Sequence, residues 1–339
     1  MDTTIDKSNV RRVIMEEPTQ FAEGLAIAKD VRVQGDFDSV MLSAMGGSAL
    51  PGNILRIYLN DIFRRNVNQK RIQVYQNRFY TLPPESYHKC LNIFDSFSGD
   101  TEETVASFEE ALHHKLPSVG VAGGGIIEQM CTKYHVPFAR LPFPYEGFQP
   151  RMALGYAFSA LVQILVNAGM IKDCTNEVRG LQDSLQTSMD EMETRGKALA
   201  KKLSGKTPII YASAKFKALA MIFKIKINEN AKTPAFYNFF PELNHNEMVG
   251  FTNPQADFSF VLLRDPDDHP QNLKRYDVLQ RIFIEKGLPV ETYDLIGKSA
   301  IEKTFASFLF ADWTSYYLAL GYKQDPTPID MVEDFKKML

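Results

Sequence analysis

The chain has 339 residues, of which 45% are hydrophobic and 23% charged, a composition typical of a soluble globular protein with room for two domains. A net charge of −3 and a pI near 6.1 predict no nucleic-acid or membrane partner, so an anionic ligand needs a local site. Three scattered cysteines, Cys90, Cys131 and Cys174, argue against a disulfide framework or a structural zinc site. The N-terminus lacks the apolar stretch of a secretory signal, and we expect a cytoplasmic protein.

Short apolar runs alternate with amphipathic segments along most of the sequence. Strands are expected at 38–46, 91–98, 118–122, 207–212, 257–263 and 288–293. Helices are expected at 49–59, 101–114, 126–134, 149–171, 174–203, a segment ending at 228, 271–286 and 299–320. This alternation predicts βαβ units and an α/β fold with two doubly wound parallel-sheet domains in tandem. The expected limits are 1–170 for the first domain, 171–204 for a linking helix and 205–339 for the second domain.

Residues 152–171 form a nearly continuous apolar stretch, about as long as a membrane-spanning helix. Gln163 and Asn167 interrupt it, and segments of ordinary polarity flank it. We therefore predict a buried central helix.

Ser96, Ser98 and Thr101 cluster with Gly99 where an expected strand ends and the next helix begins. Ligands of open parallel sheets bind at the carboxyl ends of the strands. A helix N-terminus adds free N–H groups and about half a positive charge, so this loop is a candidate phosphate site.

An alternative for the same loop is a polar turn in which Asp100 caps the helix and Glu103 reaches back to it. The two interpretations are compatible, because a cap positions the helix that would bind the anion. Gly46, Gly47 and Ser48 form a second turn at an equivalent strand end, although glycine turns are common in any α/β fold.

Glu229 and His245 each lie between two asparagines. The segments around them otherwise have the sequence character of buried core and of turn. These two residue types are readily tuned to move protons near neutral pH, and acid–base chemistry is the leading idea. A solvated helix carboxylate and a turn histidine are the alternative. Arg151 precedes the apolar helix, where a permanent positive charge either pairs with a structural carboxylate or stabilises negative charge on a ligand.

Several segments occur together in one order: Ala44–Ala49, Ser96–Thr104, Gln149–Arg151 with Ala153–Tyr156, Asn228–Lys232 and Pro241–Val249. In this arrangement the chain resembles the bifunctional phosphoglucose/phosphomannose isomerases, which consist of two sugar isomerase (SIS) domains with flavodoxin-like sheets. The glutamate and histidine segments are the specific part of the resemblance. Many sugar-phosphate binders share the serine loop.

The resemblance implies a role for each matched residue. Gly46, Gly47, Ser48, Ser96, Ser98 and Thr101 would bind the sugar phosphate, Arg151 would stabilise an enediolate, Glu229 would carry the proton between C1 and C2, and His245 would assist ring opening. A lysine of the last helix aligns best as Lys336, with Lys337 as the alternative. The resemblance also implies a homodimer in which His245 enters the partner's site.

Two positions depart from the family pattern. Asp100 stands where the family usually has Asn, which places a carboxylate near the phosphate, and the Gly123–Gly125 turn lacks a serine often found there. The expected activity is interconversion of glucose 6-phosphate, and of mannose 6-phosphate, with fructose 6-phosphate. It needs no metal and no other cofactor, since acid–base groups and a positive charge suffice. An isomerase for another sugar phosphate and a non-catalytic sugar-phosphate sensor are the alternatives.

Overall fold

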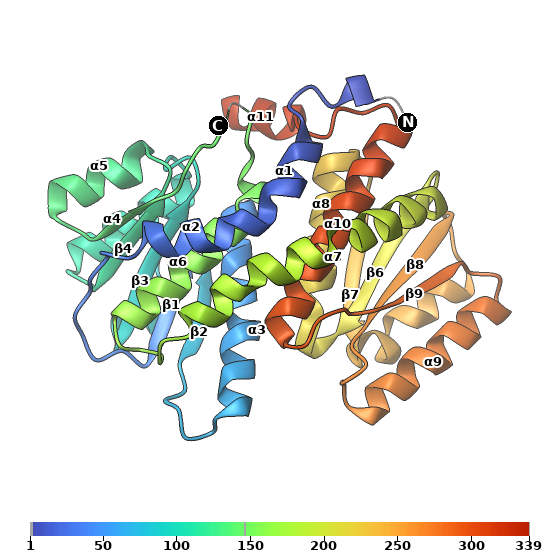
Figure 1. Ribbon diagram of the computed structural model, residues 1–339, viewed down its shortest axis with the longest axis horizontal. Coiled ribbons are helices and arrows are strands. Elements are labelled where there is room, and N and C mark those ends of the chain that lie inside the picture. The colour runs from blue at the N-terminus through green and yellow to red at the C-terminus, as the bar shows by residue number, and fades with distance from the viewer. Residues whose placement is uncertain (1–2, 146, 339) are drawn as a thin grey trace. The chain divides into compact units, whose positions relative to one another are not determined.

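The structure of the protein, a computed structural model, describes residues 3–145 and 147–338 (Figure 1). The chain forms two compact units. The first unit is Glu16–Gln186, and the second unit combines Met1–Met15 with Thr187–Leu339. The long helix α7 (Thr175–Leu203) begins in the first unit and ends in the second. The expected outer domain limits, 1 and 339, lie outside the described residues.

The first unit contains a parallel sheet of five strands in the order β2-β1-β3-β4-β5. Its strands are β1 (Ser39–Ser43), β2 (Gln73–Asn77), β3 (Cys90–Ser96), β4 (Ser118–Ala122) and β5 (Phe138–Arg140). Its helices are α2 (Gln20–Ile27), α3 (Leu50–Arg65), α4 (Glu102–His113), α5 (Gly125–Tyr134) and α6 (Leu154–Asn167). Every residue of β1, β3 and β4 is buried, as expected for the central strands of a parallel sheet that is covered on both faces.

The strand order of the first unit reverses between β1 and β3. From β1 the chain crosses to β2 through α3, and from β3 it proceeds the other way through α4 and α5. Right-handed crossovers in opposite directions put α3 and α4 on opposite faces of the sheet. Accordingly α3 packs with α6, whereas α4 packs with α5. The register pairs Ser43 with Phe94, so the loops that follow β1 and β3 leave the sheet side by side, at the position where doubly wound folds bind ligands.

The apolar stretch at 152–171 forms η5 (Pro150–Met152) and α6. Eleven of the 14 residues of α6 are buried, which confirms the predicted buried helix. Among the described residues, no helix is long and apolar enough to cross a membrane.

The second unit contains a parallel sheet of four strands in the order β7-β6-β8-β9. Its strands are β6 (Thr207–Ser213), β7 (Phe236–Phe240), β8 (Phe258–Arg264) and β9 (Val290–Asp294). Its helices include α1 (Val10–Glu16), α8 (Lys217–Ala231), α9 (Pro270–Glu285), α10 (Ala300–Gly321) and α11 (Asp330–Lys337). The order again reverses next to the first strand, between β6 and β8, so the predicted class of two doubly wound parallel α/β sheets is confirmed.

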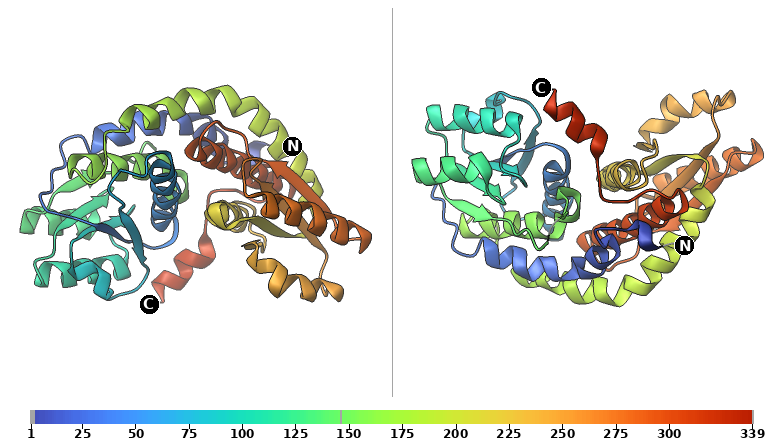
Figure 2. Two further views of the ribbon diagram at one scale, coloured as in Figure 1. Left: turned by 90° about the horizontal axis from the view of Figure 1, so that it is seen from below. Right: turned by 90° about the horizontal axis from the view of Figure 1, so that it is seen from above.

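Helix α1 belongs to the second unit although it lies at the start of the sequence. Val13 and Ile14 are buried. Arg11 Nη2 lies 3.1 Å from Glu193 Oε1, and its guanidinium carbon lies 5.4 Å from the centre of the Trp313 ring. Helix α1 therefore packs beside α10, as the views from two further directions show (Figure 2).

The aromatic run at 236–240 forms β7, an edge strand. Phe240 is fully buried in the core of the second unit, whereas Phe236 is 55% exposed and Tyr237 is 40% exposed. One end of this strand therefore supplies the core, and the other end leaves an aromatic surface.

Candidate active site

Two hydroxyls of the serine loop (Ser96–Thr101), those of Ser96 and Thr101, are hydrogen-bonded to each other. Ser96 ends β3, and its Oγ lies 2.8 Å from Thr101 Oγ1 and accepts a hydrogen bond from Gly99 N at 3.0 Å. Gly99 has a φ of +85°, and glycine adopts this conformation without steric strain. Ser98 is exposed, and its Oγ accepts from Asp100 N at 3.3 Å. The loop thus turns sharply and leads directly into α4.

The loop after β1 is tied to the serine loop. Ser48 Oγ accepts a hydrogen bond from Phe97 N at 3.0 Å. A Cβ atom at Gly47 would lie 2.9 Å from Arg151 N, closer than ordinary packing allows, so this contact requires glycine. The first unit therefore brings Ser48 to the serine loop and Gly47 to the segment that carries Arg151.

Arg151 is almost completely buried, with 1% exposure. Gln20, on α2, fixes the segment that follows: its Nε2 donates to Met152 O at 2.7 Å and its Oε1 accepts from Gly155 N at 3.1 Å. Sequence reasoning missed Gln20, because its partners lie more than 130 residues away.

Asp100 does not cap α4, so the alternative interpretation of this loop as a capped turn is wrong in that respect. The N-cap residue of α4 is Thr101, which makes no side-chain cap, and its hydroxyl is bonded to Ser96. The carboxylate of Asp100 instead accepts from Ile126 N, in the first turn of α5, at 3.0 Å. A local pattern misled here because the helix that Asp100 caps begins 25 residues further along the chain.

Asp95 was not predicted as part of the site. It lies in β3 next to Ser96, has no exposed surface, and neither carboxyl oxygen has a hydrogen-bonding partner among the described residues. Burial raises the pKa of this carboxyl well above its ordinary value, and the nearby Ser48 hydroxyl opposes the rise.

Glu229 lies in the last turn of α8, in the second unit, and is partly buried. Its two asparagine neighbours have structural roles. Asn228 Oδ1 accepts from Ala235 N at 2.9 Å, and the buried Asn230 donates to Ser315 Oγ on α10 at 2.9 Å. One turn earlier, Lys226 Nζ pairs with Asp312 Oδ1 of α10 at 2.6 Å, and both side chains are buried. These contacts hold the end of α8 that presents Glu229.

His245 ends the short helix η7 (Glu242–His245) and is exposed. The segment around it is anchored by Glu247, which accepts from Tyr211 Oη of β6 at 2.5 Å and from Asn238 Nδ2 of β7. Burial, followed by the hydrogen bond to Glu247, raises the pKa of Tyr211. Sequence reasoning also missed this anchoring role of Glu247, because its partners Tyr211 and Asn238 belong to other elements of the sheet.

Lys336 and Lys337 both lie on α11, where every described residue is exposed. Lys336 pairs with Glu333 and Lys337 with Asp334, each at 3.0 Å. The geometry treats the two lysines alike, and Lys336 remains the prediction. The predicted residues are thus divided: the serine loop, the glycine turn and Arg151 belong to the first unit, and Glu229, His245 and Lys336 to the second.

The second sheet is built differently at the equivalent position, where β6 and β8 end. Asp265, which follows β8, has a fully buried side chain and pairs with Lys215 at 2.8 Å and with Lys303 of α10 at 2.6 Å. Burial alone would raise the pKa of Asp265, but the hydrogen bonds from the two lysines outweigh it and lower that pKa. Internal ion pairs therefore fill this position, which in the first unit is lined by hydroxyls.

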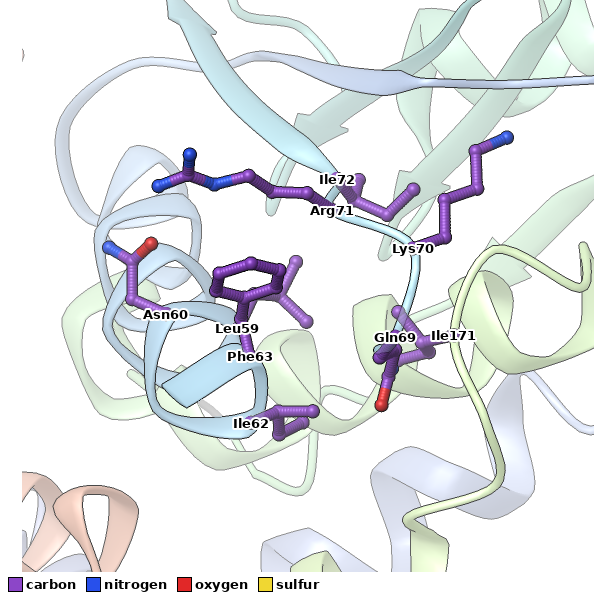
Figure 3. A pocket seen from close by; sticks show the side chains of 9 residues that line it. All are labelled: Leu59, Asn60, Ile62, Phe63, Gln69, Lys70, Arg71, Ile72 and Ile171. Atoms are coloured by element: carbon purple, nitrogen blue, oxygen red, sulfur yellow. The ribbon is translucent and has the colours of Figure 1, made fainter. Parts of the chain in front are cut away.

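A small pocket of the first unit lies at the other end of its sheet, where α3 ends and β2 begins (Figure 3). Its volume is about 10 Å³, roughly the space that holds one water molecule. Leu59, Phe63 and Ile72 line it together with the stems of Lys70 and Arg71. This pocket is too small for a sugar phosphate.

Known structures share this architecture. The chain superposes on a tagatose-6-phosphate ketose/aldose isomerase from Escherichia coli with a TM-score of 0.69 and 14% identity, over 95% of each chain. The chain therefore shares the fold of this structure.

Sequence relatives are more specific. Residues 192–339 match the model of the bacterial phospho-glucose isomerase C-terminal SIS domain. A bifunctional phosphoglucose/phosphomannose isomerase of Caldicellulosiruptor bescii is 33% identical over 95% of this chain and 96% of its own length. A bifunctional phosphoglucose/phosphomannose isomerase of Aquifex aeolicus is 30% identical over 96% of this chain and 99% of its own length. The chain belongs to the family of bifunctional phosphoglucose/phosphomannose isomerases.

Proposed function

We propose that this protein interconverts fructose 6-phosphate with glucose 6-phosphate and with mannose 6-phosphate. Family membership over nearly the whole chain carries the proposal. The hydroxyl-lined loop beside an uncapped helix N-terminus is the feature of the structure that supports it. Acid–base chemistry of this kind needs no metal ion.

The serine loop and the first turn of α4 anchor the phosphate through hydroxyl and N–H donors. Glu229 removes the proton from the carbon beside the open-chain carbonyl and returns it to the neighbouring carbon. Negative charge develops on the two oxygens of the enediolate between these steps, and the guanidinium of Arg151 stabilises it while the hydroxyl proton passes from one oxygen to the former carbonyl oxygen. His245 transfers the proton that opens the sugar ring, and Lys336 adds positive charge near the substrate.

We further propose a homodimer in which His245 completes the site of the partner subunit. Two observations support it. His245 is exposed, and Phe236 and Tyr237 leave an aromatic surface on edge strand β7 of the same unit. A two-fold interface would bury that surface on both chains at once.

A coupled assay that starts from fructose 6-phosphate and scores both aldose products, with EDTA present, tests the activity. We expect both products to form at rates that EDTA leaves unchanged. Formation of neither product at saturating substrate would reject the isomerase. If neither product forms but sugar phosphates still bind in calorimetry, the protein is a sensor.

A further inference from the structure

The serine loop is bonded to the beginning of α5. Gly123 N donates to Phe97 O and Ile127 N to Gly99 O, both at 3.0 Å. The third bond comes from Ile126 N to the carboxylate of Asp100, also at 3.0 Å. The loop that leads out of β3 is thus held by the segment that leads out of β4.

Glycines make this contact close. A Cβ atom at Gly99 would lie 1.9 Å from Gly124 O, and one at Gly125 would lie 2.5 Å from Asp100 Oδ1 and 2.6 Å from Ser98 O. Gly99 and Gly125 have φ angles of +85° and +68°, which side chains disfavour. The triple-glycine turn, which lacks the family's serine, therefore provides a surface on which the serine loop rests.

Two helices begin beside this loop, α4 at Glu102 and α5 at Gly125. Each N-terminus has free N–H groups that attract an anion. The carboxylate of Asp100 binds the N-terminus of α5, whereas the N-cap residue of α4, Thr101, makes no side-chain cap. A carboxylate that is bonded to an N–H group at a helix N-terminus is compensated in charge, so it repels a nearby phosphate less than a solvated one.

We propose that Asp100 is a positioning residue: its carboxylate binds the N-terminus of α5 and so holds the serine loop with its hydroxyls and the first turn of α4 open to the phosphate. The inference rests on the proposed function for its effect on catalysis. Its structural part, the restraint of the loop by α5, stands independently of it.

Three variants test this inference: Asp100→Ala, Asp100→Asn and, as a matched control, Asp173→Ala. Asp173 Oδ1 accepts from Thr175 N at 2.9 Å at the start of α7, so its replacement removes a similar helix cap far from the serine loop in sequence. We expect Asp100→Ala to raise KM for fructose 6-phosphate about 10-fold, as loss of one hydrogen bond to a charged group implies, with kcat nearly unchanged. Asp100→Asn retains an acceptor oxygen and should stay within about 3-fold of wild type, as should Asp173→Ala.

Two kinetic outcomes would overturn the proposal. An unchanged KM in Asp100→Ala would mean that the bond to Ile126 does not position the loop. A KM lowered about 10-fold in Asp100→Asn, about 1.4 kcal/mol of binding free energy, would mean that the carboxylate faces the phosphate rather than α5.

Hydrogen exchange supplies a readout that needs no activity. We expect the amides of Ile126 and Ile127 to exchange faster in Asp100→Ala than in wild type, and to be protected again in Asp100→Asn. Equal exchange rates in wild type, Asp100→Ala and Asp100→Asn would refute the restraint of the serine loop by α5, even if the enzyme is active. If wild type proves inactive while this exchange pattern appears, the proposed function fails and the restraint stands.

Discussion

Gly47 lies against the backbone of Arg151, and a Cβ atom at position 47 would come within 2.9 Å of Arg151 N. Gly47→Ala should therefore push apart the two segments that the first unit holds together. If Arg151 stabilises the enediolate, a shift of its backbone should lower kcat about 10-fold to 100-fold, as measured in the coupled assay.

Gly180→Ala is the matched control, because a Cβ atom at Gly180 in α7 would meet nothing within 4 Å. This control should retain wild-type kcat and gain about 0.5–1 kcal/mol of unfolding free energy, since alanine is favoured over glycine inside helices. Equal kcat in both variants would show that Arg151 does not depend on the contact with Gly47.

Glu229→Gln keeps the size of the side chain but removes the base. General acid–base catalysis typically contributes about 100-fold to 10,000-fold, and for the sole carbon base we expect kcat to fall by the upper figure or more, with little change in substrate affinity. The exposed carboxylate Glu285, at the end of α9, provides the control Glu285→Gln, which should retain full turnover. A Glu229→Gln enzyme with more than about a tenth of wild-type turnover would assign the base elsewhere.

Ser98→Ala and Thr101→Ala test the phosphate anchor. Each variant would lose a hydrogen bond to a charged group, so KM should rise more than kcat falls, by about 10-fold to 100-fold. Thr101→Ala also removes the contact with Ser96 Oγ at 2.8 Å and should be the more damaging of the two. Competitive inhibition by inorganic phosphate that is equally strong in wild type and both variants would place the phosphate elsewhere.

Asp95 makes stability depend on pH. Its folded-state pKa is raised by burial, whereas in the unfolded chain it titrates near its ordinary value of about 3.9. The neutral side chain is therefore favoured only in the folded protein, and stability is lost as pH rises above the unfolded-state pKa towards the folded-state pKa. Asp95→Asn is neutral throughout, so its stability relative to wild type should increase with pH, with a slope approaching about 1.4 kcal/mol per pH unit.

Urea denaturation of wild type and Asp95→Asn between about pH 5 and pH 7.5 measures this difference, in the range where ordinary aspartates are already ionised. Asp190→Asn, at an exposed position of α7, serves as the control. A pH-independent difference between wild type and Asp95→Asn would mean that Asp95 is charged in the folded protein.

Subunit mixing tests the shared site. Glu229→Gln and His245→Ala, each inactive alone, should recover up to about half of the activity per heterodimer after exchange, because one pocket collects both lesions and the other is intact. No recovery despite demonstrated exchange would mean that each chain builds its own site.

The central strands, the longer helices and the serine loop were predictable because their signals are local. The strand expected at 118–122 coincides with β4, and α7 differs from its prediction by one residue at its start. Edge strands β2, β5 and β7 were missed. The partly exposed β2 and β5 lack a continuous apolar run, whereas β7 is an aromatic run that was not assigned to a strand. The aromatic β7 supplies both a core residue, Phe240, and an exposed surface at Phe236 and Tyr237.

Long-range contacts account for the rest. Asp100 looked like the cap of the helix that follows it, whereas its partner Ile126 belongs to the next helix of the sheet. The burial of Asp95 and the anchoring of the His245 segment by Tyr211 and Glu247 depend on strand neighbours. No sequence spacing reports such neighbours before the topology is known.

The contact between α1 and α10 affects the order in which the two units can fold during synthesis. Arg11 leaves the ribosome early, yet its partners Glu193 and Trp313 follow about 180 and 300 residues later. The first unit, Glu16–Gln186, is continuous in sequence and can fold while synthesis proceeds. The second unit must wait for Trp313 with helix α1 unpacked, so deleting α1 would harm a unit that is completed after the first one.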